Sequence, residues 1–134
     1  MAMPAVRRSG RATMTIELNH IIIPVHDKHA SARFVAEILG VPVAAEVGPF
    51  VQIRTGNGVT LDFMTAGRFE PHHCAFLVSE KDFDAVFARL AATGRAYWAD
   101  PMHRRAGEID HQDGGRAVYF EDPSGHNLEI LTTP

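Results

Sequence analysis

After residue 15, hydrophobic and polar residues follow the same order twice along the chain. Each unit opens with an apolar strand pattern, continues with a helix-capping residue and a helical period of apolar positions, and ends in three short strand patterns. The first unit covers residues 15–66 and the second covers residues 72–133. This repetition predicts an α+β fold built from two βαβββ modules, with a helix over one face of each sheet.

In the first unit, β-branched residues predict a strand over 16–25. Asp27 is a suitable N-cap for a helix that runs to Leu39 and ends at Gly40. Strand patterns follow at 43–47, 50–54 and 59–64. The Gly-Asn-Gly sequence at 56–58 is typical of a hairpin turn, so the last two strands should pair.

In the second unit, a strand is predicted over 73–78, and Ser79 is the expected N-cap of a helix that ends at Gly94. Strand patterns follow at 95–98, 116–121 and 127–132. Between the first two of these lies a polar segment, 99–115, for which no secondary structure is predicted. Long loops of this kind are more often functional than not, so we interpret 99–115 as a lid over a site.

Composition and charge exclude several classes of function. The chain has 134 residues, 46% of them hydrophobic and 22% charged, which fits one folded domain at 15–134. A net charge of −3 gives no basic surface for nucleic acid, and no apolar run is long enough to span a membrane. Cys74 is the single cysteine, so no intrachain disulfide can form, and a cytoplasmic location is expected. Residues 1–14 are expected to be a disordered basic tail.

Four strands each carry one metal-ligating side chain on the face opposite their apolar row: His20, Asp62, His73 and Glu129. The histidines occupy the first strands of their units and the carboxylates the last strands, so the repeat places them at equivalent positions. Two imidazoles and one carboxylate suit non-haem Fe(II), whereas a second carboxylate gives a set suited to Zn, Ni, Mn or Co as well. Asp62 could instead pair with Arg54 on the neighbouring hairpin strand.

Three segments carry a family resemblance: 18–21 (LNHI), 73–78 (HCAFLV) and 119–129 (YFEDPSGHNLE). Together they resemble the vicinal oxygen chelate superfamily, which includes glyoxalase I, extradiol dioxygenases and bleomycin-resistance proteins. The resemblance extends over residues 15–133. It implies that the paired modules form a cup-shaped mixed sheet with helices outside, and that His20, His73 and Glu129 bind a divalent metal inside the cup.

The C-terminal segment also resembles the signature of ring-cleaving extradiol dioxygenases. In that signature, His111 and Tyr119 precede the metal ligand Glu129 and act on the substrate. The resemblance then implies Fe(II) as cofactor, a small catechol-like substrate, a proton shuttle at His111 and a hydrogen bond from Tyr119.

Two alternatives remain open. Glyoxalase I-like lyases use a carboxylate at the position of Asp62 as a fourth ligand, and bleomycin-resistance proteins bind an antibiotic in the same cup without a metal. Retention of the histidine and carboxylate set favours an enzyme with a small-molecule substrate.

The two modules expose sheet edges, so a homodimer is expected. In a form with modules exchanged between chains, one chain contributes His20 and Asp62 to a site, and its partner contributes His73 and Glu129. Four further histidines are expected at the surface: His26, His29, His72 and His126.

Overall fold

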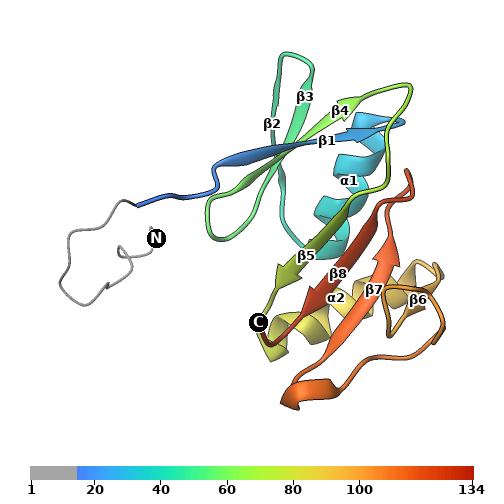
Figure 1. The fold of residues 1–134 in the computed structure, drawn as a ribbon. Coiled ribbons are helices and arrows are strands. Elements are labelled where there is room, and N and C mark those ends of the chain that lie inside the picture. The colour runs from blue at the N-terminus through green and yellow to red at the C-terminus, as the bar shows by residue number, and fades with distance from the viewer. Residues whose placement is uncertain (1–14) are drawn as a thin grey trace.

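The computed structural model describes residues 15–134 and contains the two predicted modules in sequence order (Figure 1). The tail predicted for residues 1–14 lies outside the described residues. Each module contributes one four-stranded mixed sheet and one helix, as predicted. No helix within 15–134 is long and apolar enough to cross a membrane.

The first sheet has the strand order β1-β4-β3-β2. Its elements are β1 (His20–Val25), α1 (Lys28–Leu39), β2 (Val43–Val47), β3 (Phe50–Arg54) and β4 (Thr60–Thr65). Strand β1 is parallel to β4 and begins four residues later than predicted. The reason is that β4 begins at Thr60, directly opposite His20, so the residues before His20 have no neighbouring strand.

The second sheet repeats this topology in the order β5-β8-β7-β6. Its elements are β5 (His73–Leu77), α2 (Glu80–Ala92), β6 (Tyr97–Trp98), β7 (Ala117–Glu121) and β8 (Asn127–Leu131). The strands β1 and β5 therefore both lie at an edge of their own sheet, and each has one free side.

The helix boundaries agree with the predicted caps. The Asp27 carboxylate accepts hydrogen bonds from the backbone of His29 and Ala30, which would otherwise be unpaired donors at the start of α1. Gly40 ends α1 with a left-handed φ of 74°, a conformation that glycine adopts without strain. Ser79 caps α2 by accepting a hydrogen bond from the backbone of Asp82.

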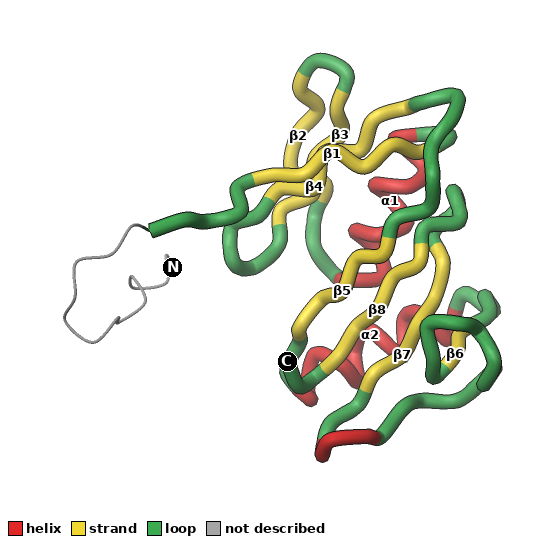
Figure 2. The backbone as a smooth tube through the Cα atoms, in the orientation of Figure 1, coloured by secondary structure: helices red, strands yellow, loops and turns green. Residues whose placement is uncertain are grey.

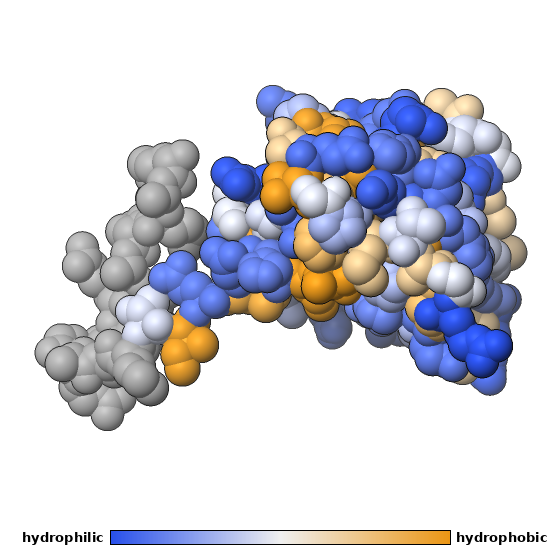
Figure 3. All heavy atoms as spheres, turned by 90° about the horizontal axis from the view of Figure 1, so that it is seen from above, coloured by the Kyte–Doolittle hydropathy of each residue, from blue (hydrophilic) through white to orange (hydrophobic). Residues whose placement is uncertain are grey.

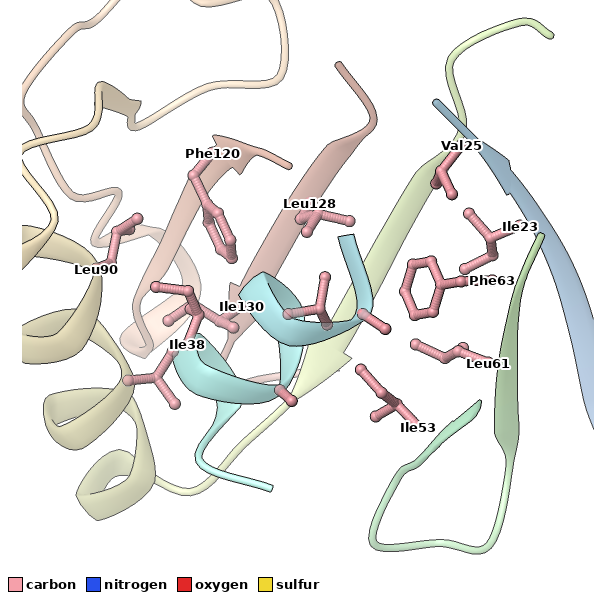
Figure 4. Close-up of a cluster of buried hydrophobic side chains, with 14 of the residues drawn as sticks. Ile23, Val25, Ile38, Ile53, Leu61, Phe63, Leu90, Phe120, Leu128 and Ile130 are labelled. Atoms are coloured by element: carbon pink, nitrogen blue, oxygen red, sulfur yellow. The ribbon is translucent and has the colours of Figure 1, made fainter. Parts of the chain in front are cut away.

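Both modules share one hydrophobic core, in which α1 lies between the two sheets (Figures 2 and 4). Phe34 of α1 packs against Phe120 of β7, with 6.3 Å between ring centroids. The core includes residues of both modules that are nearly or fully buried: Ile23, Val25, Ile38, Ile53, Phe63, Phe83, Leu90, Phe120 and Ile130. The modules therefore fold as one unit.

His126 links the second module to the first by a hydrogen bond. The prediction that it lies at the surface is wrong, because it is 1% exposed. Its Nε2 donates to the Pro24 carbonyl at 2.6 Å, and its Nδ1 accepts the His72 backbone N–H at 2.7 Å. The turn that follows β7 places His126 against the end of β1, a tertiary contact that local sequence does not reveal.

The segment 99–115 is more ordered than predicted. It contains a 3-10 turn, η1 (Gln112–Gly114), and two isolated β-bridges, Trp98–Ala106 and Asp110–Ala117. The Asp100 carboxylate accepts the backbone N–H groups of Arg104 and Arg105 at 2.8 and 2.7 Å. The interpretation of this segment as a loop without secondary structure is therefore wrong, because its backbone polar groups find partners within the segment and on β7.

Candidate functional site

The second module holds an imidazole and a carboxylate in direct contact. His73 Nε2 lies 3.1 Å from Glu129 Oε1, between the neighbouring strands β5 and β8. The His73 side chain is 46% exposed and the Glu129 side chain 11% exposed. The Glu129 carboxylate is thus held within the sheet, while the His73 imidazole is accessible to a ligand.

Tyr119 lies directly opposite Glu129 in the β7–β8 register, and its ring centroid is 5.9 Å from that of His73. Burial raises the pKa of the Tyr119 hydroxyl to about 12, with further contributions from the negative charge of Glu129 and a hydrogen bond to it. The register places Tyr119 on the same face of the sheet as Glu129. At neutral pH the Tyr119 phenol is protonated, so its O–H can donate a hydrogen bond.

The first module carries the corresponding pair, His20 and Asp62. His20 Nδ1 is 2.9 Å from Asn19 Oδ1, and the Asp62 carboxylate accepts a hydrogen bond from Gln52 Nε2 at 3.0 Å. Asp62 is 5% exposed. Arg54, its suggested partner, lies opposite Thr60, and the described chain contains no ion pair between Arg54 and Asp62.

The strand registers make the two pairs equivalent. In each module the histidine lies opposite the residue two positions before the carboxylate: Thr60 in the first and Asn127 in the second. A polar side chain lies opposite each carboxylate, Gln52 in one module and Tyr119 in the other. The sequence repeat therefore persists in the three-dimensional positions of these residues.

The structure places the four residues two in each sheet, and not as one group; within residues 15–134, His73 and Glu129 are the two of them in hydrogen-bond contact. Within residues 15–134 no three His, Cys, Asp or Glu side chains are close enough together to hold a metal ion. The pairs belong to separate sheets, and the free edges of β1 and β5 border them.

His111 is not brought to either pair by a contact in the structure. It is exposed at the start of η1, and its side chain does not cap that turn. A different histidine of the same segment, His103, packs on Trp98 with 3.7 Å between ring centroids. The sequence did not single out His103 or Gln52, although the alternation along 50–54 could have identified Gln52 as the neighbour of Asp62.

Large apolar side chains are exposed beside the free strand edges. Leu18, Ile21, Ile22 and Leu77 are 67%, 39%, 43% and 61% exposed. Seen from above, the surface shows apolar patches between polar residues (Figure 3). A groove of about 1010 Å³ runs between β1, β5 and α2, and Leu18, Ile21, Phe76 and Leu77 are among its lining residues.

Two βαβββ modules with a histidine and a carboxylate at matched positions define a glyoxalase-like protein. The model of the Glyoxalase/Bleomycin resistance protein/Dioxygenase superfamily matches residues 17–130, and the chain belongs to this superfamily.

Known relatives differ in their activities. The structure of "Oxidase ChaP-H2" is 59% identical, with a TM-score of 0.88, over 90% of this chain and 96% of that one. The glutathione transferase FosA of Serratia marcescens is 30% identical over 87% of this chain and 81% of its own length. A lactoylglutathione lyase from Agrobacterium tumefaciens has the same fold, with a TM-score of 0.69 at 15% identity over 90% of this chain and 96% of that one.

Proposed function

We propose that this protein is a divalent-metal-dependent oxidase of the ring-cleaving dioxygenase type, which uses Fe(II) and a catechol-like aromatic substrate. The observation that carries this proposal is the contact between His73 and Glu129, repeated in register by His20 and Asp62. The identity of 59% to a protein called an oxidase supports oxidation as the reaction type.

The site is completed between two chains. His20 of one protomer joins His73 and Glu129 of its partner when the free edge of β1 pairs with the free edge of β5. This arrangement covers exposed apolar residues beside these edges and supplies the third ligand that one chain lacks. Two such sites form in a symmetric dimer.

The donor set fits the proposed metal. Two neutral imidazoles and one carboxylate leave coordination positions open for substrate, as in the facial triads of non-haem iron enzymes. Bound Fe(II) supplies Lewis-acid and one-electron chemistry. Tyr119, whose phenol is protonated at neutral pH, donates a hydrogen bond to a substrate oxygen beside Glu129. His111, which is exposed at the start of η1, is proposed as the proton shuttle.

A glyoxalase I-like lyase is the second candidate. Asp62 favours it, because this carboxylate is buried and occupies the position that corresponds to Glu129. In this function Asp62 is a fourth metal ligand, and a carboxylate of the site takes a proton from the carbon next to a carbonyl group.

Metal content and two activity assays test the proposal. We expect stoichiometric iron in the purified protein, oxygen uptake with catechols and no isomerisation of a hemithioacetal. Changing His20, His73 or Glu129 to alanine should abolish tight metal binding, whereas His29→Ala, which removes an exposed imidazole elsewhere, should not. Full metal binding by all three variants, or isomerase activity without oxygen uptake, would contradict the dioxygenase function.

A further inference from the structure

Trp98 and His103 stack face to face, and this stacked pair, which we call the aromatic wall, lies on the same face of the sheet as Tyr119 and Glu129. Their rings are parallel to within 3°, and their centroids are 3.7 Å apart. Trp98 lies opposite Tyr119 on β7, and Tyr119 lies opposite Glu129 on β8, so the three side chains form one row across the sheet. Figure 1 shows β6 and the following loop beside β7, at the outer edge of this sheet.

His103 is held in place at a conformational cost. Its φ is +60°, a left-handed conformation that is unfavourable for a residue with a Cβ. It follows a turn closed by a hydrogen bond from the His103 N–H to the Asp100 carbonyl, a position where glycine is usual. The sequence places an imidazole at a position that favours glycine, which points to a role for the ring.

The ring itself has a fixed orientation. The Asn127 amide donates to the Pro101 carbonyl at 3.3 Å, so Asn127 Oδ1 is free to accept a hydrogen bond from His103 Nε2 at 3.1 Å. The other ring nitrogen, Nδ1, lies 3.7 Å from Glu121 Oε2. Side chains of β7 and β8 therefore fix the orientation of the His103 ring.

The spacing of the row defines what the wall can bind. Two strand separations place Trp98 roughly 10 Å from Glu129. A single catechol ring bound beside Glu129 is too short to reach Trp98, whereas two or three fused rings span this distance. A pocket of about 190 Å³, lined by Arg95, Ala96, Trp98 and Glu121, lies at the Trp98 end of the row.

We propose that Trp98 and His103 bind the distal ring of a fused, planar aromatic substrate, and that this wall selects fused-ring diols over single-ring catechols. The inference rests on the proposed function for the position of the diol end, next to His73 and Glu129. It adds two residues that determine specificity and a substrate size class.

Trp98 is the only tryptophan in the chain, so its fluorescence reports directly on the wall. In metal-free dimer, 2,3-dihydroxynaphthalene should quench Trp98 emission at concentrations where catechol does not. Calorimetric titration then gives the affinity for each diol. Quenching of equal extent by both diols, or by neither, would overturn the proposal.

His103→Gly removes the ring and relieves the backbone strain, so it separates binding from folding. We expect unchanged or higher thermal stability and about a 3- to 10-fold weaker affinity for 2,3-dihydroxynaphthalene, with catechol unaffected. Met102→Ala is the matched control, because Met102 lies in the same turn and is 69% exposed. An affinity for 2,3-dihydroxynaphthalene that is unchanged in His103→Gly, or a parallel loss for both diols, refutes the wall.

Different results would reject the dioxygenase function and the aromatic wall. Fused-ring selectivity in binding without oxygen uptake on any diol leaves the wall in place and rejects the dioxygenase function. Oxygen uptake with equal kcat/KM for both diols, unchanged in His103→Gly, rejects the wall and leaves the dioxygenase function in place.

Discussion

Mixing two inactive variants tests whether the metal site is shared between protomers. His20→Ala disables the pair in the first module, and Glu129→Ala disables the pair in the second. If each site combines the first module of one protomer with the second module of its partner, a mixed dimer has one site with both changes and one site with neither. The two halves are in separate sheets, and within 15–134 no three ligating side chains come together in one chain.

The expected magnitude follows from counting sites. Random mixing makes half of the dimers mixed, and one site in each mixed dimer is intact, so about one quarter of wild-type activity returns. A mixed dimer isolated with two affinity tags should bind about one metal ion, whereas each parent variant binds none. Metal content gives this result without knowledge of the substrate.

The matched control mixes His73→Ala with Glu129→Ala. Both changes fall in the second module, so every site in the mixed dimer keeps one defect and neither metal nor activity should return. If the first mixture also stays empty although mixed dimers have been isolated, each site lies within one chain and the shared site is refuted. A protein that sediments as a monomer at micromolar concentration would refute it as well.

Three further predictions concern single residues. His126→Ala should lower the free energy of unfolding, measured in urea, by about 2–4 kcal/mol, because it removes two buried hydrogen bonds and leaves a cavity. A loss as small as that of His29→Ala would show that His126 does not hold the two modules together. In metal-free protein, absorbance titration should show Tyr119 ionising with a pKa of about 12, and Glu129→Gln should lower this pKa. Because the folded pKa exceeds the unfolded value of about 10, the stability that the protonated Tyr119 contributes is complete below pH 10 and is lost as the pH rises through 12. A Tyr119 pKa near 10 in both proteins would contradict the assigned causes. Asp62→Asn should leave metal affinity and oxygen uptake within a few-fold of wild type, and loss of both would favour the glyoxalase-like lyase instead.

Sequence patterns predicted the features that depend on local chemistry. The caps Asp27 and Ser79 fix where the helices begin, and strand alternation identified the apolar rows that form the core. These features were predictable because each depends on residues within a few positions along the chain.

Features that depend on contacts between distant segments were missed. His126 reads as a loop residue, yet it is buried by contact with the end of β1, about one hundred residues earlier in the chain. His103 reads as one polar residue among many in 99–115, and only the folded turn shows its ring on Trp98. The separation of the two ligand pairs was also not visible, because strand alternation gives the face of each residue and not the placement of one sheet against the other.

The two histidine–carboxylate pairs have matched registers but different partners for their carboxylates, and this difference bears on the proposed chemistry. In the first module the Gln52 amide donates to Asp62, a shorter side chain that is 5% exposed. In the second module Glu129 faces Tyr119 and contacts His73, whose imidazole is half-exposed. Asp62 is one methylene shorter than Glu129 and its carboxylate is hydrogen-bonded to an amide, so turning it toward a metal costs more than using Glu129, which already contacts an imidazole. We therefore expect three ligands, His20, His73 and Glu129, with Asp62 retained as a polar support, which leaves the open positions that oxidation of a diol requires.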